Sequence, residues 1–84
     1  MTALCDELIN LISDEALVDK DKLTPGATLA DTGLDSVDVI SITFAVEEKY
    51  GVEIADDAFA DIANFGQLLS ILEAAVEKKA HSPP

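Results

Sequence analysis

The sequence predicts an all-α fold, a small bundle of three main helices plus one short helix, with a long loop between the first two main helices. The chain has 84 residues, which is the size of one small domain. Apolar residues recur at helical spacing in three stretches, and no two runs alternate as paired strands would. Hydrophobic residues make up 49% of the chain but aromatic residues only 5%, so the core of this single domain, 1–84, must be aliphatic.

The first helix is predicted over residues 2–16, where Leu4, Leu8 and Leu11 recur at helical spacing. Residues 17–35 are predicted to form a long ordered loop, because they contain Thr24-Pro25-Gly26 and Gly33, which are typical of turns. Loops of this length in small domains are usually functional or disordered.

The remaining elements are a helix over 36–50, a short helix over 56–62, a last helix over 64–79 and a flexible tail over 80–84. Gly51 is a good stop for the first of these. Asp56 is expected to cap the short helix, whereas Asn64 and Gln67 resemble a capping box that opens the last one.

The helix predicted over 36–50 has two apolar faces, which one helix in a small bundle cannot easily bury together. The face expected to lie in the core consists of Val39, Ile42, Val46 and Tyr50. The other face, with Val37, Ile40 and Phe44, is rimmed by acidic residues and resembles a transient protein docking surface. The alternative is that neighbouring segments bury both faces.

The charge of the chain restricts its partners. A formal net charge of -12 repels phosphate backbones and anionic lipid, so we expect no nucleic acid and no membrane insertion, and basic proteins are the natural complement. Cys5 is the only cysteine, which leaves no internal disulfide, and Asp19-Lys20-Asp21 lacks the rest of a calcium loop, so no metal site is expected. The acidic amino terminus is unlike a signal peptide and favours a cytoplasmic protein.

Ser36 lies at the junction between the long loop and the helix over 36–50. By position, its hydroxyl is most simply an N-cap; the functional alternative is a modification site. It is a poor hydrolase nucleophile, because the only histidine, His81, lies in the predicted tail and no Gly-x-Ser-x-Gly elbow is present.

The string Gly33-Leu34-Asp35-Ser36-Val37-Asp38, followed by a helix that ends Glu47-Glu48-Lys49-Tyr50-Gly51, resembles the acyl carrier proteins. The hallmark of that family is an Asp-Ser-Leu tripeptide, of which Asp35-Ser36-Val37 is a close variant. The resemblance covers roughly residues 4–77 and implies a four-helix carrier fold.

The resemblance also implies a cofactor site and a cargo pocket. Ser36, between Asp35 and Val37, would carry 4'-phosphopantetheine derived from coenzyme A, whose thiol holds an acyl group as a thioester, and the protein would not be an enzyme. An acyl chain would fold among Val39, Ile42, Val46, Ile54, Phe59, Ile62 and Leu68. Partner enzymes would bind Asp35, Val37, Asp38, Ile40, Ser41, Phe44, Glu47, Glu48, Asp56 and Asp57.

The implied partners are a phosphopantetheinyl transferase and enzymes of the acyl-transferring, ketosynthase or ligase type with basic docking patches, served by a monomeric carrier. The pathway would be fatty-acid, polyketide or specialised lipid biosynthesis. Val37, Thr32, Ser41 and Ala55 depart from the commonest fatty-acid carrier pattern and favour a specialised carrier. The alternatives are a peptidyl or aminoacyl carrier with the same arm and an unmodified acidic helical adaptor.

Overall fold

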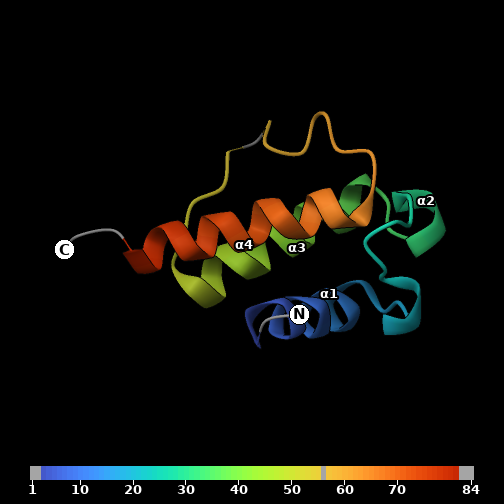
Figure 1. Ribbon diagram of the computed structural model, residues 1–84, viewed down its shortest axis with the longest axis horizontal. Coiled ribbons are helices and arrows are strands. Elements are labelled where there is room, and N and C mark those ends of the chain that lie inside the picture. Colours follow the sequence, from blue (N-terminus) through green and yellow to red (C-terminus); the bar gives the residue numbers. More distant parts are fainter. Residues whose placement is uncertain (1–2, 56, 82–84) are drawn as a thin grey trace.

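Three long helices carry the fold: α1 (Ala3–Ala16), α3 (Ser36–Tyr50) and α4 (Phe65–His81). The computed structural model describes residues 3–55 and 57–81, and all the regular elements in that part of the chain are helical. Each long helix contacts the other two, and the segment between α3 and α4 arches back along them to the start of α4 (Figure 1). The predicted class, three main helices and one short helix, is confirmed.

The short helix lies elsewhere than expected. The connection between α1 and α3, predicted as a loop over 17–35, contains a single 3-10 turn η1 (Lys20–Lys22) and the four-residue helix α2 (Leu29–Thr32). A capping box opens α2: the Thr28 side chain accepts from the Asp31 N–H, and the Asp31 side chain accepts from the Thr28 N–H. So short an element has too few apolar positions to show a helical period.

The helix expected over 56–62 is not observed. Residues 57–61 form consecutive turns, in which Ala60 N–H bonds to Asp57 O at 3.1 Å and Ile62 N–H to Phe59 O at 3.4 Å; Asp56 lies outside the described residues. Asp57 and Asp61 would be four residues apart in a helix, where like charges repel, and seven residues give a marginal helix without that penalty.

The helix predicted over 36–50 agrees with α3 at both ends, and the ends of the last helix differ from the prediction by one or two residues. The first helix is described from Ala3 to Ala16, and its predicted start at residue 2 lies outside the described residues. The last helix runs to His81 and so includes the first two residues of the predicted tail, of which 82–84 are not described. Asn64 Oδ1 accepts from the Gln67 N–H at 2.9 Å, which is one half of the predicted capping box, whereas the Gln67 side chain accepts from the Ala63 N–H instead of the Asn64 N–H.

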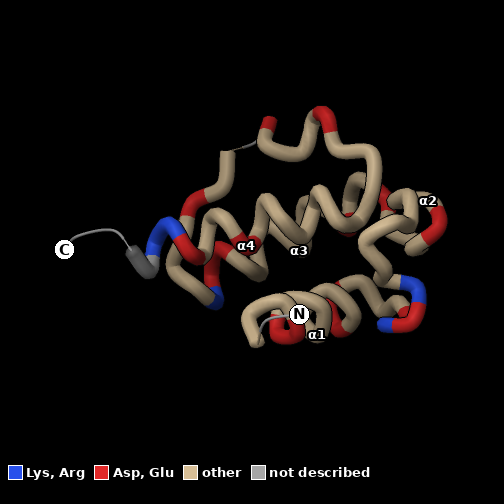
Figure 2. The backbone as a smooth tube through the Cα atoms, in the orientation of Figure 1, with Lys and Arg blue, Asp and Glu red and all other residues tan. Residues whose placement is uncertain are grey.

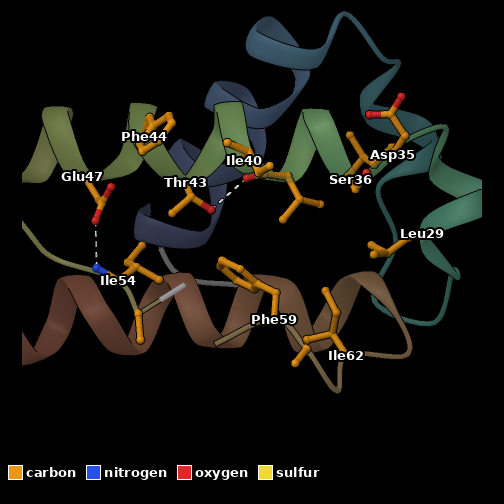
Figure 3. A pocket seen from close by; sticks show the side chains of 14 residues that line it. Leu29, Asp35, Ser36, Ile40, Thr43, Phe44, Glu47, Ile54, Phe59 and Ile62 are labelled. Atoms are coloured by element: carbon orange, nitrogen blue, oxygen red, sulfur yellow. Dashed lines mark hydrogen bonds between the residues drawn. The ribbon is translucent and has the colours of Figure 1, made fainter. Parts of the chain in front are cut away.

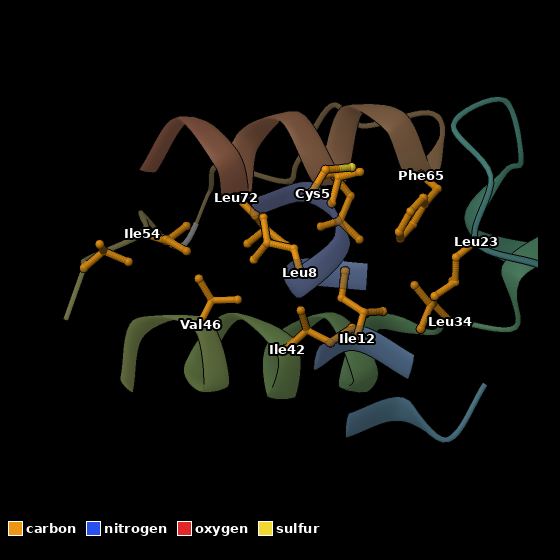
Figure 4. Close-up of a cluster of buried hydrophobic side chains, with 13 residues drawn as sticks. Cys5, Leu8, Ile12, Leu23, Leu34, Ile42, Val46, Ile54, Phe65 and Leu72 are labelled. Atoms are coloured by element: carbon orange, nitrogen blue, oxygen red, sulfur yellow. The ribbon is translucent and has the colours of Figure 1, made fainter. Parts of the chain in front are cut away.

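The core lies where the inner faces of α1, α3 and α4 meet. Figure 4 shows its side chains pointing between the helices, and those with no exposed surface are Leu8, Ile12, Ile42, Val46, Phe65, Leu68 and Leu72. Val39 and Tyr50 are half-buried against this cluster, so the predicted core face of α3 is confirmed.

The loop before α2 is attached to the beginning of α4. Phe65 N–H donates to Ala27 O at 2.8 Å, and Gly66 N–H donates to Pro25 O at 3.0 Å. These carbonyls satisfy N–H groups that a helix start leaves without intrahelical partners. A Cβ on Gly66 would lie 2.9 Å from Pro25 O, so only glycine permits this close approach.

Acidic residues are spread over the molecule, whereas Lys occurs in three short stretches, at residues 20–22, 49 and 78–79 (Figure 2). Between residues 31 and 61 there are nine Asp and Glu and one Lys. None of the helices in the part of the chain described is long and apolar enough to span a membrane.

Candidate functional site

The helix that bears Ser36 is capped by the residue before it. Asp35 is the N-cap of α3: its Oδ1 accepts from the Asp38 N–H at 2.8 Å, and Asp38 Oδ2 accepts from the Asp35 N–H at 3.2 Å. The two aspartates therefore form a reciprocal capping box. The interpretation of Ser36 as the N-cap is wrong, because Asp35 already fills that position.

Ser36 is instead the first residue of α3 and is exposed. Its hydroxyl makes no hydrogen bond within residues 3–55 and 57–81, so its oxygen is available for chemistry. The free N–H groups and the dipole of a helix start favour a bound phosphate at such a position. Asp35 and Asp38 add negative charge beside it, which favours a basic partner surface.

A buried threonine fixes the loop that leads to Ser36. The Thr32 side chain has no exposed surface; its hydroxyl donates to Leu29 O at 2.6 Å and accepts from the Leu34 N–H at 3.3 Å. Gly33, with φ 86°, then reverses the chain and lets Leu34 enter the core. These contacts explain how a polar residue is accommodated in the interior at position 32.

An apolar groove of about 510 Å³ begins beside Ser36 and runs along α3. Figure 3 shows α3 on one side of it and Ile54, Phe59 and Ile62 on the other. Its lining residues are Leu29, Leu34, Asp35, Ser36, Val39, Ile40, Thr43, Phe44, Glu47, Ile54, Ala55, Phe59, Ala60 and Ile62. An aliphatic chain attached near Ser36 could bury its methylenes in this groove.

The groove includes four of the seven residues predicted to surround an acyl chain, namely Val39, Ile54, Phe59 and Ile62. The other three, Ile42, Val46 and Leu68, are not among its lining residues and have no exposed surface. They face the closed core between the helices instead. Helical spacing could not separate these two environments, because both are apolar.

Besides Asp35, two other polar side chains of the groove bond to the backbone. The Thr43 hydroxyl donates to Val39 O at 2.8 Å, as expected for a threonine inside a helix. Glu47 Oε2 accepts from the Ile54 N–H at 2.9 Å and so joins α3 to the segment that follows it (Figure 3). Glu47 is half-buried rather than fully exposed, which the sequence reading of an outward-facing acid did not anticipate.

The second apolar face of α3 is exposed, and the alternative in which both faces are buried is wrong. The exposed fractions are 66% for Val37, 55% for Ile40 and 64% for Phe44, far above those of core residues. We call these three residues the exposed stripe. An exposed apolar strip of this kind is typical of interaction surfaces on small proteins.

The polar residues assigned to partner binding lie in different environments. Asp35, Glu48 and Asp57 are exposed, Asp38 and Ser41 are half-buried, and Asp56 is outside the described residues. Lys49, the basic residue on α3, lies with Nζ 3.9 Å from Glu7 Oε1. It therefore pairs with α1.

The surroundings of Ser36 suit the attachment of a carried group. No group of three or more His, Cys, Asp or Glu is placed to hold a metal ion within the described chain. Ser36 combines an unbonded hydroxyl, a helix start and an adjoining apolar groove. These features suit the attachment of a phosphate-linked group and the partial burial of what it carries.

Comparison with known proteins agrees with this interpretation. A family model described as a phosphopantetheine attachment site matches residues 6–72. An acyl carrier protein of Helicobacter pylori is 38% identical over 72 residues, which make up 84% of this chain and 92% of that protein. An acyl carrier protein of Sinorhizobium fredii is 34% identical over 76 residues, 89% of this chain and 97% of that protein.

The fold and the matched residues define the class as that of phosphopantetheine-dependent carrier domains. Within that class, the chain belongs to the acyl carrier protein family. Members hold a covalently attached 4'-phosphopantetheine group and work as carriers, not as catalysts. They interact with a phosphopantetheinyl transferase and with acyl-handling enzymes.

Proposed function

We propose that Ser36 is the attachment site and that this protein presents acyl thioesters to enzymes of fatty-acid, polyketide or specialised lipid biosynthesis. In the attachment step a bond forms between Ser36 Oγ and the β-phosphorus of coenzyme A. The bond from that phosphorus to 3',5'-adenosine diphosphate breaks, and the hydroxyl proton leaves to a base of the transferase. The arm then supplies a thiol that holds the acyl group.

The observation that carries the proposal is the state of the Ser36 hydroxyl. It is exposed, it has no hydrogen-bond partner within the described residues, and it stands at the start of α3. Ser41, on the same helix, is half-buried. A transferase could therefore reach the Ser36 oxygen without unfolding the helix.

The cargo is proposed to be aliphatic because of the groove. Ten of its fourteen lining residues are Leu, Val, Ile, Phe or Ala, so each methylene that enters it leaves water. Between Asp35 and Glu47 at its two ends, the groove offers an amino group of an aminoacyl cargo only the Thr43 hydroxyl, so such a group would lose hydration there. The groove thus favours an acyl carrier over a peptidyl or aminoacyl carrier.

The partner surface is proposed to be the exposed stripe together with Asp35, Asp38 and Glu48, which we call the docking surface. Apolar contact with Val37, Ile40 and Phe44 would supply affinity, and the acidic rim would orient basic partner enzymes. The phosphate on Ser36 would add to that charge. An acidic adaptor without the arm would use the same surface but leave Ser36 unmodified.

Attachment is tested by intact mass. The purified chain is incubated with coenzyme A and a phosphopantetheinyl transferase, and the mass is compared with that of the Ser36→Ala and Ser41→Ala variants. We expect the native chain and Ser41→Ala to gain one arm and Ser36→Ala to gain none. A gain that persists in Ser36→Ala would place the arm elsewhere, and an unchanged native mass with several transferases would contradict the carrier function.

A further inference from the structure

Glu47 lies at the opposite end of the groove from Ser36 (Figure 3). Both residues are on α3, and at the rise of an α-helix their backbones are about 16 Å apart along its axis. The groove between them therefore has a defined length. The side chains at the Glu47 end of the groove determine how far an acyl chain can enter.

Charge occurs at the two ends of the groove and not between them. Asp35 and Glu47 are the charged residues of its lining, and Asp35 stands beside Ser36, at the entrance. Between them the wall is apolar except for Thr43, whose hydroxyl is already bonded to Val39 O. A chain that enters at Ser36 meets no unsatisfied polar side chain until it reaches Glu47.

The Glu47 carboxylate cannot simply swing away from the groove. Its Oε2 accepts from the Ile54 N–H at 2.9 Å, and the side chain is half-buried. Releasing it would leave the Ile54 N–H without this partner, and Ile54 is itself a buried residue. The carboxylate is therefore held at the end of the groove by the segment that follows α3.

We infer that Glu47 sets the length of acyl chain that the groove can hold. This inference rests on the proposed attachment of the arm to Ser36. Each methylene that enters the apolar part of the groove gains from leaving water. A methylene pressed against Glu47 would instead strip water from a carboxylate, which is costly. Longer chains would then leave their last carbons in solvent.

Glu47→Gln isolates the charge. Its amide oxygen can still accept from the Ile54 N–H, so the connection between α3 and the next segment is kept while the desolvation cost falls. Glu77→Gln is the matched control, because it makes the same change at an exposed position on α4, outside the groove and the docking surface. Circular dichroism and thermal unfolding of all three proteins check that the fold is equal.

The experiment loads Ser36 with straight saturated chains from butyryl to palmitoyl, using the acyl-coenzyme A series and a phosphopantetheinyl transferase. Intact mass confirms loading first, and failure at that stage would count against the proposed function rather than against the role of Glu47. The rate of thioester cleavage by hydroxylamine is then measured against chain length, since a chain held in the groove protects the thioester.

In the native protein we expect protection to rise with length, by up to about fourfold for each methylene, and then to level off. In Glu47→Gln the chain length at which protection levels off should increase, and in Glu77→Gln it should be the same as in the native protein. Protection that never levels off, that is independent of length, or that levels off at the same chain in Glu47→Gln would overturn the inference.

Discussion

The carboxylates of Asp35 and Asp38 bond to each other's backbone N–H groups across the first turn of α3. The two N···O distances are 2.8 Å and 3.2 Å, and neither bond involves the side chain of Ser36 between them. The helix start is thus stabilised by the neighbours of the proposed attachment residue, which are also acidic parts of the docking surface.

Asp35→Ala should lower the free energy of unfolding by about 1 kcal/mol, because the cap is lost. Asp35→Asn should lose much less, since an asparagine oxygen caps as well as a carboxylate does. Urea unfolding at neutral pH measures both. Equal losses in the two variants would mean that the charge of Asp35, rather than its cap, stabilises the helix.

Glu48→Lys should weaken binding to a phosphopantetheinyl transferase or another partner by about threefold to tenfold and should flatten the salt dependence of that binding. Glu48 is chosen because it is exposed, whereas Glu47 also holds the Ile54 N–H and would confound binding with folding. Binding is measured by calorimetry at low and physiological salt.

The control for this charge reversal is Glu77→Lys, which makes the same change at an exposed position on α4, outside the docking surface. We expect near-native affinity and an unchanged salt slope for Glu77→Lys. An equal loss of affinity in both variants would show that the partner is attracted by the net charge of the protein and not by the docking surface.

Gly66→Ala should destabilise the fold by about 1 to 3 kcal/mol, because the new Cβ would lie 2.9 Å from Pro25 O and would push the loop off the start of α4. Gly26→Ala is the control in the same loop, since its Cβ would meet nothing within 4 Å. Thermal and urea unfolding compare the two. If Gly66→Ala were as stable as Gly26→Ala, the loop at Pro25 could move away from α4 without lowering the free energy of unfolding.

Ionisation of the Cys5 thiol should lower the free energy of unfolding at alkaline pH. Burial, with contributions from Glu73 and Asp6, raises the pKa of the Cys5 thiol above its ordinary value. The unfolded thiol therefore ionises first as the pH rises, which favours unfolding by up to about 1.4 kcal/mol per pH unit between its two pKa values. Below the unfolded pKa this contribution is constant.

Urea unfolding of the native chain and of Cys5→Ala, from neutral to alkaline pH, measures the effect. Cys5→Ala is expected to be less stable at neutral pH, because it leaves a small cavity, but to lose stability less steeply above the ordinary thiol pKa. Parallel pH profiles of the two proteins would contradict the shift.

Tyr50→Phe should leave stability unchanged or raise it by up to about 1 kcal/mol. The Tyr50 hydroxyl is buried and has no hydrogen-bond partner among the residues that the structure describes. Its removal therefore breaks no hydrogen bond and removes the cost of burying a polar group. The ring, over which Lys49 Nζ lies 5.4 Å from the centroid, is kept. A clear loss in urea unfolding would show that the hydroxyl does bond in solution.

Periodicity was sufficient for α1, α3 and α4, because each buries an apolar face long enough to repeat. It could not find α2, which has four residues and depends on the bonds between Thr28 and Asp31. The same Thr/Asp-x-x-Asp spacing occurs at Asp35 and Asp38, so a search for acidic capping boxes would have found both helix starts and removed Ser36 from the N-cap.

The groove was only partly predictable. Val39 and Ile42 are both apolar residues of α3, and what separates the groove from the core is the path of residues 52–62 over the helix. The bond from the Ile54 N–H to Glu47 depends on that path as well. Such contacts follow from tertiary packing, which the local pattern of apolar and charged residues does not contain.

Asp35 caps α3, whereas Ser36 is the proposed attachment residue, and this separation affects what partner enzymes meet. The arm is attached through Ser36 Oγ, and a capping serine would have to give up that oxygen as the acceptor at its helix start when the phosphodiester forms. Here the accepting oxygen belongs to Asp35, so a change in the chemistry at Ser36 leaves the helix start intact. Partner enzymes would therefore meet the same rigid α3 whether the arm is absent, empty or loaded.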